Sequence, residues 1–328
     1  MTLNRRAALG LAALAATARP VAALTPVSLQ LAPPDPTEVI RLWPGAAPGG
    51  ERVTVTPQVT ERSADPGFHD RFARYTTDPI LTVLRPDRPN GASLLLIPGG
   101  GYKWAVVDKE GLDCARVFAA AGVTCFVLRY RLPDDGWAAG PDAALQDAQR
   151  ALRLVRSQAA AHGLDPARVA VLGASAGGHL AGMLTARTDT TYAAVDAADA
   201  ASHRPDLSIL LYPVATMADP HVHAGSRLEL LGDAPTAEMI ARYSLERMDW
   251  TGRPPTFLLH AMDDAAVPVE NSLQLLTRLR AAGVPAEAHL FQEGGHGFGI
   301  RLIEGRPAAA WPELALAWAA RHGWITQT

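Results

Sequence analysis

The chain has 328 residues, a formal net charge of −3 at pH 7, and hydrophobic side chains at 48% of its positions. This length is enough for one large α/β domain with a sizeable core. The small charge, without a basic run or a stripe of basic and aromatic residues, argues against nucleic acid as a partner.

The first residues have the pattern of an export signal. An Asn-Arg-Arg tripeptide precedes an uncharged segment rich in Ala and Leu, residues 7–18, and the small residues at 21–23 offer a cleavage site. The paired arginines favour the twin-arginine route, and the apolar segment is too short to span a membrane. We therefore expect a signal peptide over residues 1–23 and one mature domain over residues 24–328. We expect the mature protein to be periplasmic or secreted and to have no membrane partner.

From residue 93 onward, apolar strand-like runs alternate with helical patterns. The strand-like runs are 93–97, 123–129, 169–173, 207–212, 256–261 and 287–291. The helical patterns are 109–121, 142–161, 177–187, 269–282 and 308–321. This alternation predicts βαβ units, and continuous runs of Val, Leu and Ile are typical of strands buried on both faces. The sequence therefore predicts an α/β fold with a mostly parallel central sheet and helices on both faces.

Several segments lie outside this alternation. Residues 53–55 and 80–84 have strand patterns with no helix between them, which predicts an antiparallel edge of the sheet. Residues 26–50 are rich in Pro, Gly and Ala, so we expect an arm that runs over the domain. Residues 188–205 and 214–253 interrupt the alternation after strands, and we expect them to shape a cleft.

Residues 173–179 read Gly-Ala-Ser-Ala-Gly-Gly-His and lie between a strand-like run and a helical pattern. This context is typical of the G-x-S-x-G nucleophile elbow, a sharp turn that presents a serine, here Ser175, in a strained backbone conformation. Small residues at Gly173 and Gly177 would let the strand and the helix approach closely. The alternative is an ordinary strand-to-helix turn, because Gly, Ala and Ser are common in this chain.

Three glycines follow the strand-like run 93–97, in Pro-Gly-Gly-Gly-Tyr at residues 98–102. Glycines let backbone N–H groups turn into a cleft without a Cβ in the way. We therefore expect the N–H groups of Gly100, Gly101 and Ala176 to hold a developing oxyanion. The alternatives are a plain glycine turn and a phosphate cradle, but a phosphate loop needs Lys-Ser or Lys-Thr after its glycines, and this chain lacks that pair here.

A carboxylate and a histidine follow the serine in the chain order that acyl transfer in this type of fold requires. Asp263 and Asp264 come directly after the strand-like run 256–261. One of them would orient a histidine, and the other would cap the helix that starts near Pro268. His296 lies in a glycine-rich loop after the last strand-like run, so it is the candidate base.

The other histidines have simpler interpretations. We expect His179, one turn into the elbow helix, to pack or to hydrogen-bond locally, and His260 lies inside a strand-like run. His221 and His223 form a His-x-His pair, but no third ligand lies nearby in the sequence. We therefore expect no metal site.

Two aromatic residues, Tyr102 and Trp104, lie beside the glycine loop. They would either form an aromatic wall for a sugar ring in the substrate or pack under the loop, and the sequence leaves both possibilities open.

Six other residues are expected to serve the structure. Cys114 lies in a helical pattern and Cys125 in a strand-like run, which favours two buried thiols over a disulfide. The charged residues expected to form salt bridges or caps are Glu110, Arg131, Arg150 and Arg204.

Four motifs together resemble the α/β-hydrolase superfamily. They are PGGGY at 98–102, GASAGGH at 173–179, HAMDDAAVPVENS at 260–272 and EGGHGFG at 293–299. Flanking segments, among them LWPGAAPG at 42–49 and DAQRALR at 147–153, more narrowly resemble exported bacterial esterases of the acetylxylan-esterase type. The resemblance covers nearly the whole mature chain. Hormone-sensitive-lipase-like esterases differ, because they carry His before the three glycines where this chain has Pro98.

The resemblance implies a serine esterase with Ser175 as nucleophile, Asp264 as acid and His296 as base. Such a site works through an acyl-enzyme and needs no metal or organic cofactor. The substrates that the resemblance implies are short acyl groups, acetyl above all, on carbohydrates such as acetylated xylan. The alternatives are a general short-chain carboxylesterase or feruloyl esterase, a serine peptidase, and an inactive carbohydrate-binding relative.

Overall fold

The computed structural model describes residues 34–65 and 69–325. The predicted signal peptide lies outside these residues. Within them, no helix combines the length and the apolar character that crossing a bilayer requires.

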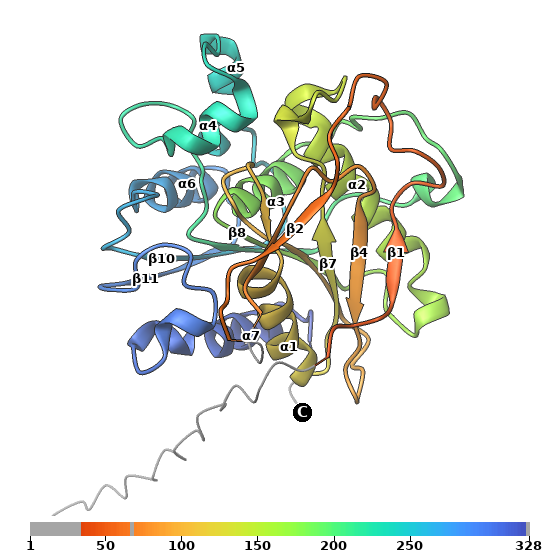
Figure 1. The fold of residues 1–328 in the computed structure, drawn as a ribbon. Coiled ribbons are helices and arrows are strands. Elements are labelled where there is room, and N and C mark those ends of the chain that lie inside the picture. The colour runs from red at the N-terminus through yellow and green to blue at the C-terminus, as the bar shows by residue number, and fades with distance from the viewer. Residues whose placement is uncertain (1–33, 66–68, 326–328) are drawn as a thin grey trace, which may run out of the picture.

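An eight-stranded sheet in the order β1-β4-β7-β5-β8-β9-β10-β11 runs through the middle of the domain (Figure 1). Six of its strands come from the predicted alternation and pair in parallel. They are β5 (Ser93–Ile97), β7 (Thr124–Arg129), β8 (Val169–Ala174), β9 (Leu207–Leu211), β10 (Thr256–Ala261) and β11 (Ala286–Phe291). The predicted mostly parallel sheet is therefore confirmed.

Helices cover both faces of the sheet, as predicted. The helices of one layer are α2 (Ala143–Ser157), α3 (Ala176–Ala186) and α6 (Glu270–Ala281), and those of the other are α1 (Asp113–Ala120) and α7 (Trp311–Arg321). Figure 1 shows α6 and α7 on opposite sides of β10 and β11. Each layer closes its own hydrophobic core against the sheet.

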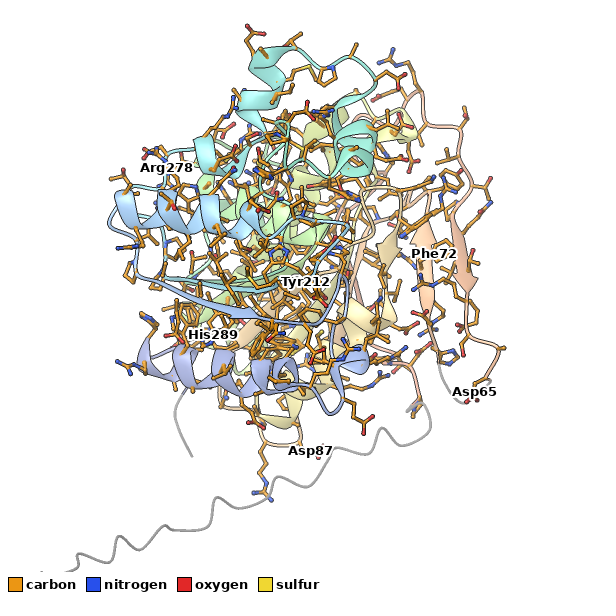
Figure 2. The ribbon with its side chains drawn as sticks, turned by 90° about the vertical axis from the view of Figure 1, so that its left-hand side faces the viewer. Asp65, Phe72, Asp87, Tyr212, Arg278 and His289 are labelled. Atoms are coloured by element: carbon orange, nitrogen blue, oxygen red, sulfur yellow. The ribbon has the colours of Figure 1, made fainter. Side chains whose placement is uncertain are left out.

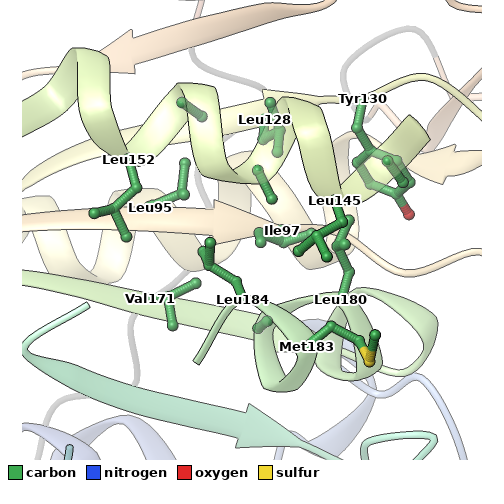
Figure 3. Close-up of a cluster of buried hydrophobic side chains, with 14 of the residues drawn as sticks. Leu95, Ile97, Leu128, Tyr130, Leu145, Leu152, Val171, Leu180, Met183 and Leu184 are labelled. Carbon is green, nitrogen blue, oxygen red and sulfur yellow. The ribbon is translucent and has the colours of Figure 1, made fainter. Parts of the chain in front are cut away.

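Alternating side chains of β5 enter the two cores. Leu95 packs in the core under α2 and α3, together with Leu152 and Leu184 (Figure 3). Its neighbours Leu94 and Leu96 belong to the opposite core, which α1 and α7 cover. Burial of each leucine stabilises the fold by about 1.5–3 kcal/mol. A strand buried in this way on both faces holds its C-terminal end firmly, and the glycine loop starts there.

The antiparallel edge differs in part from the prediction. Residues 80–84 form β4 (Ile80–Leu84), which pairs antiparallel with β7 and with β1 (Val39–Arg41). The strand predicted at 53–55 is wrong, because this segment forms no strand pairing with the described residues. Val53 packs against the core, so the apolar alternation there reflects burial rather than a hydrogen-bonded ladder.

A second, three-stranded sheet lies beside the main one. Its strands are β2 (Gln58–Glu61), β3 (Arg71–Arg74) and β6 (Ala105–Val106), all antiparallel. Because β6 follows the glycine loop closely, this small sheet forms one flank of the site described below.

The irregular segments have different places in the structure. Residues 34–50 of the predicted arm lie on the domain and bury Leu42 and Trp43. Residues 188–205 pack along α2, where Arg150 forms a salt bridge with Asp199. Residues 214–253 contain α4 (Ala224–Leu231) and α5 (Ala237–Arg242).

Both cysteines are free and buried, as predicted. Burial raises the pKa of the Cys114 and Cys125 thiols well above their ordinary values, so neither is a reactive nucleophile at neutral pH.

Candidate active site

Ser175 lies at a sharp turn between β8 and α3. Its backbone has φ 55° and ψ −122°, a strained conformation for a residue with a side chain. The turn is tight because Gly177 passes against β5, where a Cβ would stand only 2.1 Å from the carbonyl oxygen of Ile97. The predicted elbow geometry is therefore present, and the Ser175 side chain points out of the sheet at its carboxyl edge.

The structure brings Ser175, His296 and Asp264 together in one hydrogen-bonded chain. Ser175 Oγ lies 2.8 Å from His296 Nε2, and His296 Nδ1 lies 2.6 Å from Asp264 Oδ2. Ser175 and Asp264 are buried, whereas the His296 side chain is 23% exposed. The geometry requires that His296 Nδ1–H donate to the carboxylate, which leaves Nε2 free to accept the serine proton.

Asp264 accepts more hydrogen bonds than the one from His296. The backbone N–H groups of Ala266 and Val267 donate to Oδ1 at 2.9 and 2.8 Å, and His260 Nε2 lies 3.2 Å from Oδ2. Burial alone would raise the pKa of Asp264, but the hydrogen bonds from His260, His296 and Val267 outweigh it and hold the pKa well below its usual range. Asp264 is therefore ionised throughout the neutral pH range.

His260, in the strand-like run 256–261, is a further site residue that the sequence pattern does not reveal. Ser272 Oγ lies 2.7 Å from His260 Nδ1, and the carbonyl oxygen of Val267 lies 2.9 Å from Nε2. Since that carbonyl can only accept, Nε2 carries the proton and also faces Asp264. The available signal was burial itself, because a fully buried histidine needs hydrogen-bond partners.

Asp263 does not cap the following helix. Its Oδ1 accepts a hydrogen bond from the N–H of Gly295 at 2.8 Å, next to His296. Helix α6 begins at Glu270 with no side-chain cap. The neighbouring aspartates therefore hold the histidine loop at two points, Asp263 through the backbone and Asp264 through the imidazole.

The glycine loop lies across the elbow. Gly100 has φ 128°, which a residue with a Cβ rarely adopts, and a Cβ there would stand 2.3 Å from the carbonyl oxygen of Trp104. Within residues 34–65 and 69–325, no protein group accepts a hydrogen bond from the N–H of Gly100, Gly101 or Ala176. Donors left open beside a nucleophile are what an oxyanion hole requires.

One carboxylate, Glu110, joins the glycine loop to the histidine loop. Its Oε2 accepts from the N–H of Gly99 at 2.9 Å, and its Oε1 accepts from the Tyr212 hydroxyl at 3.1 Å. The same hydroxyl accepts from the N–H of Gly299 at 3.0 Å. The Tyr212 ring packs edge-on against His296 and is fully buried, and it is labelled near the middle of the view in Figure 2. Glu110 thus serves the structure through these two hydrogen bonds, and not through the salt bridge or helix cap that was predicted for it.

We expect Glu110→Gln to lower kcat by on the order of 10- to 100-fold, because small shifts of reacting groups are costly in catalysis. A glutamine amide has a single acceptor oxygen, so either Gly99 or Tyr212 loses its acceptor. KM should change little, because Glu110 is buried and acts through the two loops rather than on substrate. Steady-state kinetics with p-nitrophenyl acetate measures both constants, and Glu304→Gln at an exposed position is the control. An unchanged kcat in Glu110→Gln would show that the network does not position the site.

Of the two predicted aromatic residues, Tyr102 packs inside the protein. It is 1% exposed, and its hydroxyl lies 2.6 Å from His179 Nδ1. His179 Nε2 donates in turn to the carbonyl oxygen of Tyr243 at 2.7 Å. The structure therefore favours packing under the loop over a sugar-facing wall for Tyr102. Trp104 is half-buried against Phe72, 4.9 Å between ring centroids, and its contact with substrate stays a prediction.

Burial lowers the pKa of His179 to about 4. An unfolded histidine has a pKa near 6.5, so between about pH 6.5 and 4 the unfolded chain binds a proton that the folded chain excludes. Above about pH 6.5, His179 is neutral in both states and causes no loss of stability. As the pH is lowered below this value, protonation of His179 in the unfolded chain reduces the free energy of unfolding. We expect His179 to reduce the free energy of unfolding by about 2 kcal/mol between pH 7 and pH 5.

Urea unfolding of the wild type and of His179→Gln at pH 7, 6 and 5 measures this contribution. The loss on acidification should be smaller in His179→Gln, whereas His322→Gln, an exposed control, should retain the full loss. If the free energy of unfolding depended on pH equally in all three proteins, the lowered pKa of folded His179 would be contradicted.

His223 of the His-x-His pair has a structural contact at the start of a helix. Its Nδ1 accepts from the N–H of Ser226 at 3.1 Å and so caps α4. Within the described part of the chain, no group of three or more His, Cys, Asp or Glu residues is arranged to hold a metal ion. Helix α4 nevertheless lies next to the glycine loop, because a Cβ on Gly101 would stand 3.9 Å from His223 Cε1.

Comparisons with known proteins show the family to which the chain belongs. Residues 86–279 match the family model BD-FAE. The chain is 34% identical over 227 residues to an endo-1,4-beta-xylanase B of Butyrivibrio fibrisolvens. This alignment covers 67% of this chain and 34% of that protein. It is also 31% identical over 226 residues to an acetylxylan esterase of Xylanibacter ruminicola. This alignment covers 67% of this chain and 44% of that protein. The chain thus spans only about a third to under half the length of these two curated relatives.

Solved structures share the fold. An acetyl ester-xyloside bifunctional hydrolase from Caldicellulosiruptor lactoaceticus aligns with a TM-score of 0.70 at 32% identity, over 88% of this chain and 97% of that one. An esterase from Thermogutta terrifontis aligns with a TM-score of 0.63 at 23% identity, over 83% of this chain and 96% of that one, a likeness of fold alone. The chain belongs to the BD-FAE family, within the acetylxylan-esterase-like branch of the α/β-hydrolase superfamily.

Proposed function

We propose that this protein is a serine carboxylic ester hydrolase that releases short acyl groups, acetyl above all, from carbohydrate esters such as acetylated xylan. One observation carries the proposal: the hydrogen-bonded chain Asp264–His296–Ser175 ends at a strained serine beside three backbone N–H groups without acceptors among the described residues.

The proposed reaction is acyl transfer in two steps. Ser175 Oγ attacks the ester carbonyl carbon while His296 Nε2 takes the hydroxyl proton, and Asp264 stabilises the imidazolium that forms. The N–H groups of Gly100, Gly101 and Ala176 hold the tetrahedral oxyanion. The C–O bond to the alcohol breaks, the alcohol leaves with the proton from His296, and an acyl-enzyme remains. Water then attacks the acyl carbon by the same route and releases the carboxylic acid.

The substrate class rests on the relatives. One is named an acetylxylan esterase and another an acetyl ester-xyloside bifunctional hydrolase, and the chain covers nearly all of the latter. The proposed export of the protein through residues 1–23 fits the same substrate, because a polysaccharide is met outside the cytoplasm.

The test of substrate class is acetate release from acetylated xylan by the purified protein, beside p-nitrophenyl esters of increasing acyl length. We expect acetate release from xylan. We also expect kcat/KM to fall by at least about tenfold from the acetyl to the octanoyl ester, because a pocket that fits a short acyl group excludes a long acyl chain by its size. Ser175→Ala is the control for contaminating activity.

Other outcomes would identify the alternatives. A preference for long acyl chains would indicate a general carboxylesterase, and ferulate released faster than acetate would indicate a feruloyl esterase. Peptide cleavage without ester cleavage would indicate a peptidase. Absence of both, with no labelling by a fluorophosphonate, would indicate an inactive binding protein.

A further inference from the structure

The second histidine of the His-x-His pair, His223, lies beside the glycine loop, and the mechanism above does not use it. Its Cε1 atom is 3.9 Å from the point where a Cβ on Gly101 would stand. Gly101 is one of the three proposed oxyanion donors. His223 is half-buried, so part of its side chain is open to solvent next to the loop that would hold the ester carbonyl.

The loop that carries His223 is fixed against the catalytic serine. It begins at Val214, whose N–H donates to the carbonyl oxygen of Ser175 at 3.1 Å. The buried side chain of Asn271 then closes the loop. Its Oδ1 accepts from two backbone N–H groups at the start of the loop, and its Nδ2 donates to the carbonyl oxygen of His221 at 2.8 Å. A loop held at both ends keeps His223 at a fixed place relative to Ser175.

His223 is also close to the catalytic histidine. Burial lowers the pKa of His223, repulsion by the charge of His296 lowers it further, and the charge of Asp264 acts against both. Charges near a protein surface affect one another strongly only over short distances. The carbonyl oxygen of a reacting ester must face Gly101, and its alcohol oxygen must face His296 Nε2, which lies 2.8 Å from Ser175 Oγ. His223, close to both, therefore borders the space that the ester occupies.

The ring of His223 has one unused donor. Its Nδ1 accepts from the N–H of Ser226 at 3.1 Å and lies 2.8 Å from Ser226 Oγ, so the proton of the neutral ring is on Nε2. The lowered pKa keeps the ring neutral at pH 7. Within residues 34–65 and 69–325, Nε2 has no hydrogen-bond partner, and it is not among the unpartnered polar atoms that are buried away from solvent. A molecule that enters the site can therefore reach this N–H.

We infer that His223 is a substrate-binding residue that donates its Nε2–H to an oxygen atom of the sugar on the alcohol side of the ester. An acetyl group has no acceptor other than its carbonyl oxygen, which the three backbone donors of the proposed oxyanion hole would hold. A sugar ring carries several hydroxyl groups, and each of their oxygens is an acceptor. This inference rests on the proposed function, since it names a residue that would recognise the alcohol part of the substrate.

Two complementary substitutions separate the donor from the helix cap. Asparagine is a good N-cap residue, so His223→Asn keeps an acceptor for the N–H of Ser226 but removes the donor at Nε2. Glutamine is longer, and His223→Gln can place an amide N–H near the position of Nε2 while it loses the cap. We expect His223→Asn to lower kcat/KM for acetylated xylo-oligosaccharides by about 3- to 10-fold, the range for one hydrogen bond, and His223→Gln to recover most of this loss.

The reference substrate is p-nitrophenyl acetate, which has no sugar. Its kcat/KM should change by no more than about twofold in His223→Asn, because no sugar contact is there to be lost. His221→Asn is the matched control, since its side chain faces Glu270 at 3.9 Å, and it should leave both substrates within about twofold of wild type. Equal losses on both esters in His223→Asn would overturn the inference. Loss of sugar selectivity in His223→Gln alone would leave His223 only its cap, and would overturn it too.

A binding measurement separates this inference from the proposed activity. Calorimetric titration of xylotriose into Ser175→Ala protein needs no turnover, and the second change His223→Asn should weaken binding by about 3- to 10-fold. Equal binding in the two proteins, or binding in neither, would overturn the role of His223 even where the wild type hydrolyses esters. Weaker binding in the double variant, with no ester hydrolysis by the wild type, would instead contradict the proposed function. Thermal unfolding checks each variant, and His223→Ser, which also keeps a cap without an N–H, carries the test if His223→Asn does not fold.

Discussion

Ser175→Ala should remove roughly 10⁴- to 10⁶-fold of kcat on p-nitrophenyl acetate, because it deletes the atom that forms the acyl-enzyme. The fold should survive, because alanine retains the Cβ and the side chain of Ser175 has only His296 as a hydrogen-bond partner in the described residues. Steady-state kinetics and thermal unfolding of the same preparations measure the two effects. Residual activity above the uncatalysed rate is expected from the oxyanion donors alone.

The matched control for this change is Ser157→Ala, at an exposed position at the end of α2. It should retain wild-type kcat and KM. Ester hydrolysis within tenfold of wild type in Ser175→Ala would mean that another group performs the attack, and the proposed mechanism would then fail.

Asp264→Asn should lower kcat at pH 7 by on the order of 10⁴-fold. The amide nitrogen of asparagine donates, so it would face donors at a place where the carboxylate accepts from His296, His260 and the backbone of Val267. His296 would then lose the acceptor that keeps its proton on Nδ1, and Nε2 would no longer be held ready to accept from serine.

Asp263→Asn makes the same chemical change one residue earlier and is the control. Its side-chain oxygen can still accept from the N–H of Gly295, so we expect activity within about tenfold of wild type. Similar losses in the two variants would argue that the histidine loop, rather than the orientation of the imidazole by Asp264, sets the rate.

Stability should respond to pH with the sign that the Asp264 pKa dictates. Because the folded pKa lies below the ordinary value, the ionised carboxylate stabilises the fold above about pH 4, and that contribution is lost as the pH falls further. Asp264→Asn should therefore be less stable than wild type at pH 7. The difference should narrow under strong acid.

Much of the fold was predictable because its signals are local. Each parallel strand is a continuous apolar run, and each loop of the site carries its own glycine-rich or acidic motif directly after such a run. The residues of the serine, acid and histidine loops lie together because parallel strands end at one edge of the sheet. The strand prediction for residues 53–55 is wrong for the opposite reason. An alternating apolar pattern shows which side chains are buried, but it does not show whether a second strand lies alongside to form hydrogen bonds.

The remaining features depend on contacts between distant segments. Glu110 joins two loops through Tyr212, and nothing in the spacing of these residues shows that their side chains meet. His260 contacts Asp264 because the loop after β10 folds back on the strand. Tyr102 directly follows the glycine loop in the sequence, a position that also suits a residue that contacts substrate. Only its hydrogen bond with His179 shows that the side chain points inward.

In the proposed mechanism Ser175 becomes covalently acylated, and intact-protein mass spectrometry with a fluorophosphonate probe is the most direct test of this step. A fluorophosphonate reacts with a serine that has been activated for acyl transfer, and digestion locates the modified peptide. We expect one adduct, on the peptide that contains Ser175, and we expect it to be absent in Ser175→Ala and to form far more slowly in Asp264→Asn. No adduct on the wild type, or an equal adduct on Ser175→Ala, would contradict it.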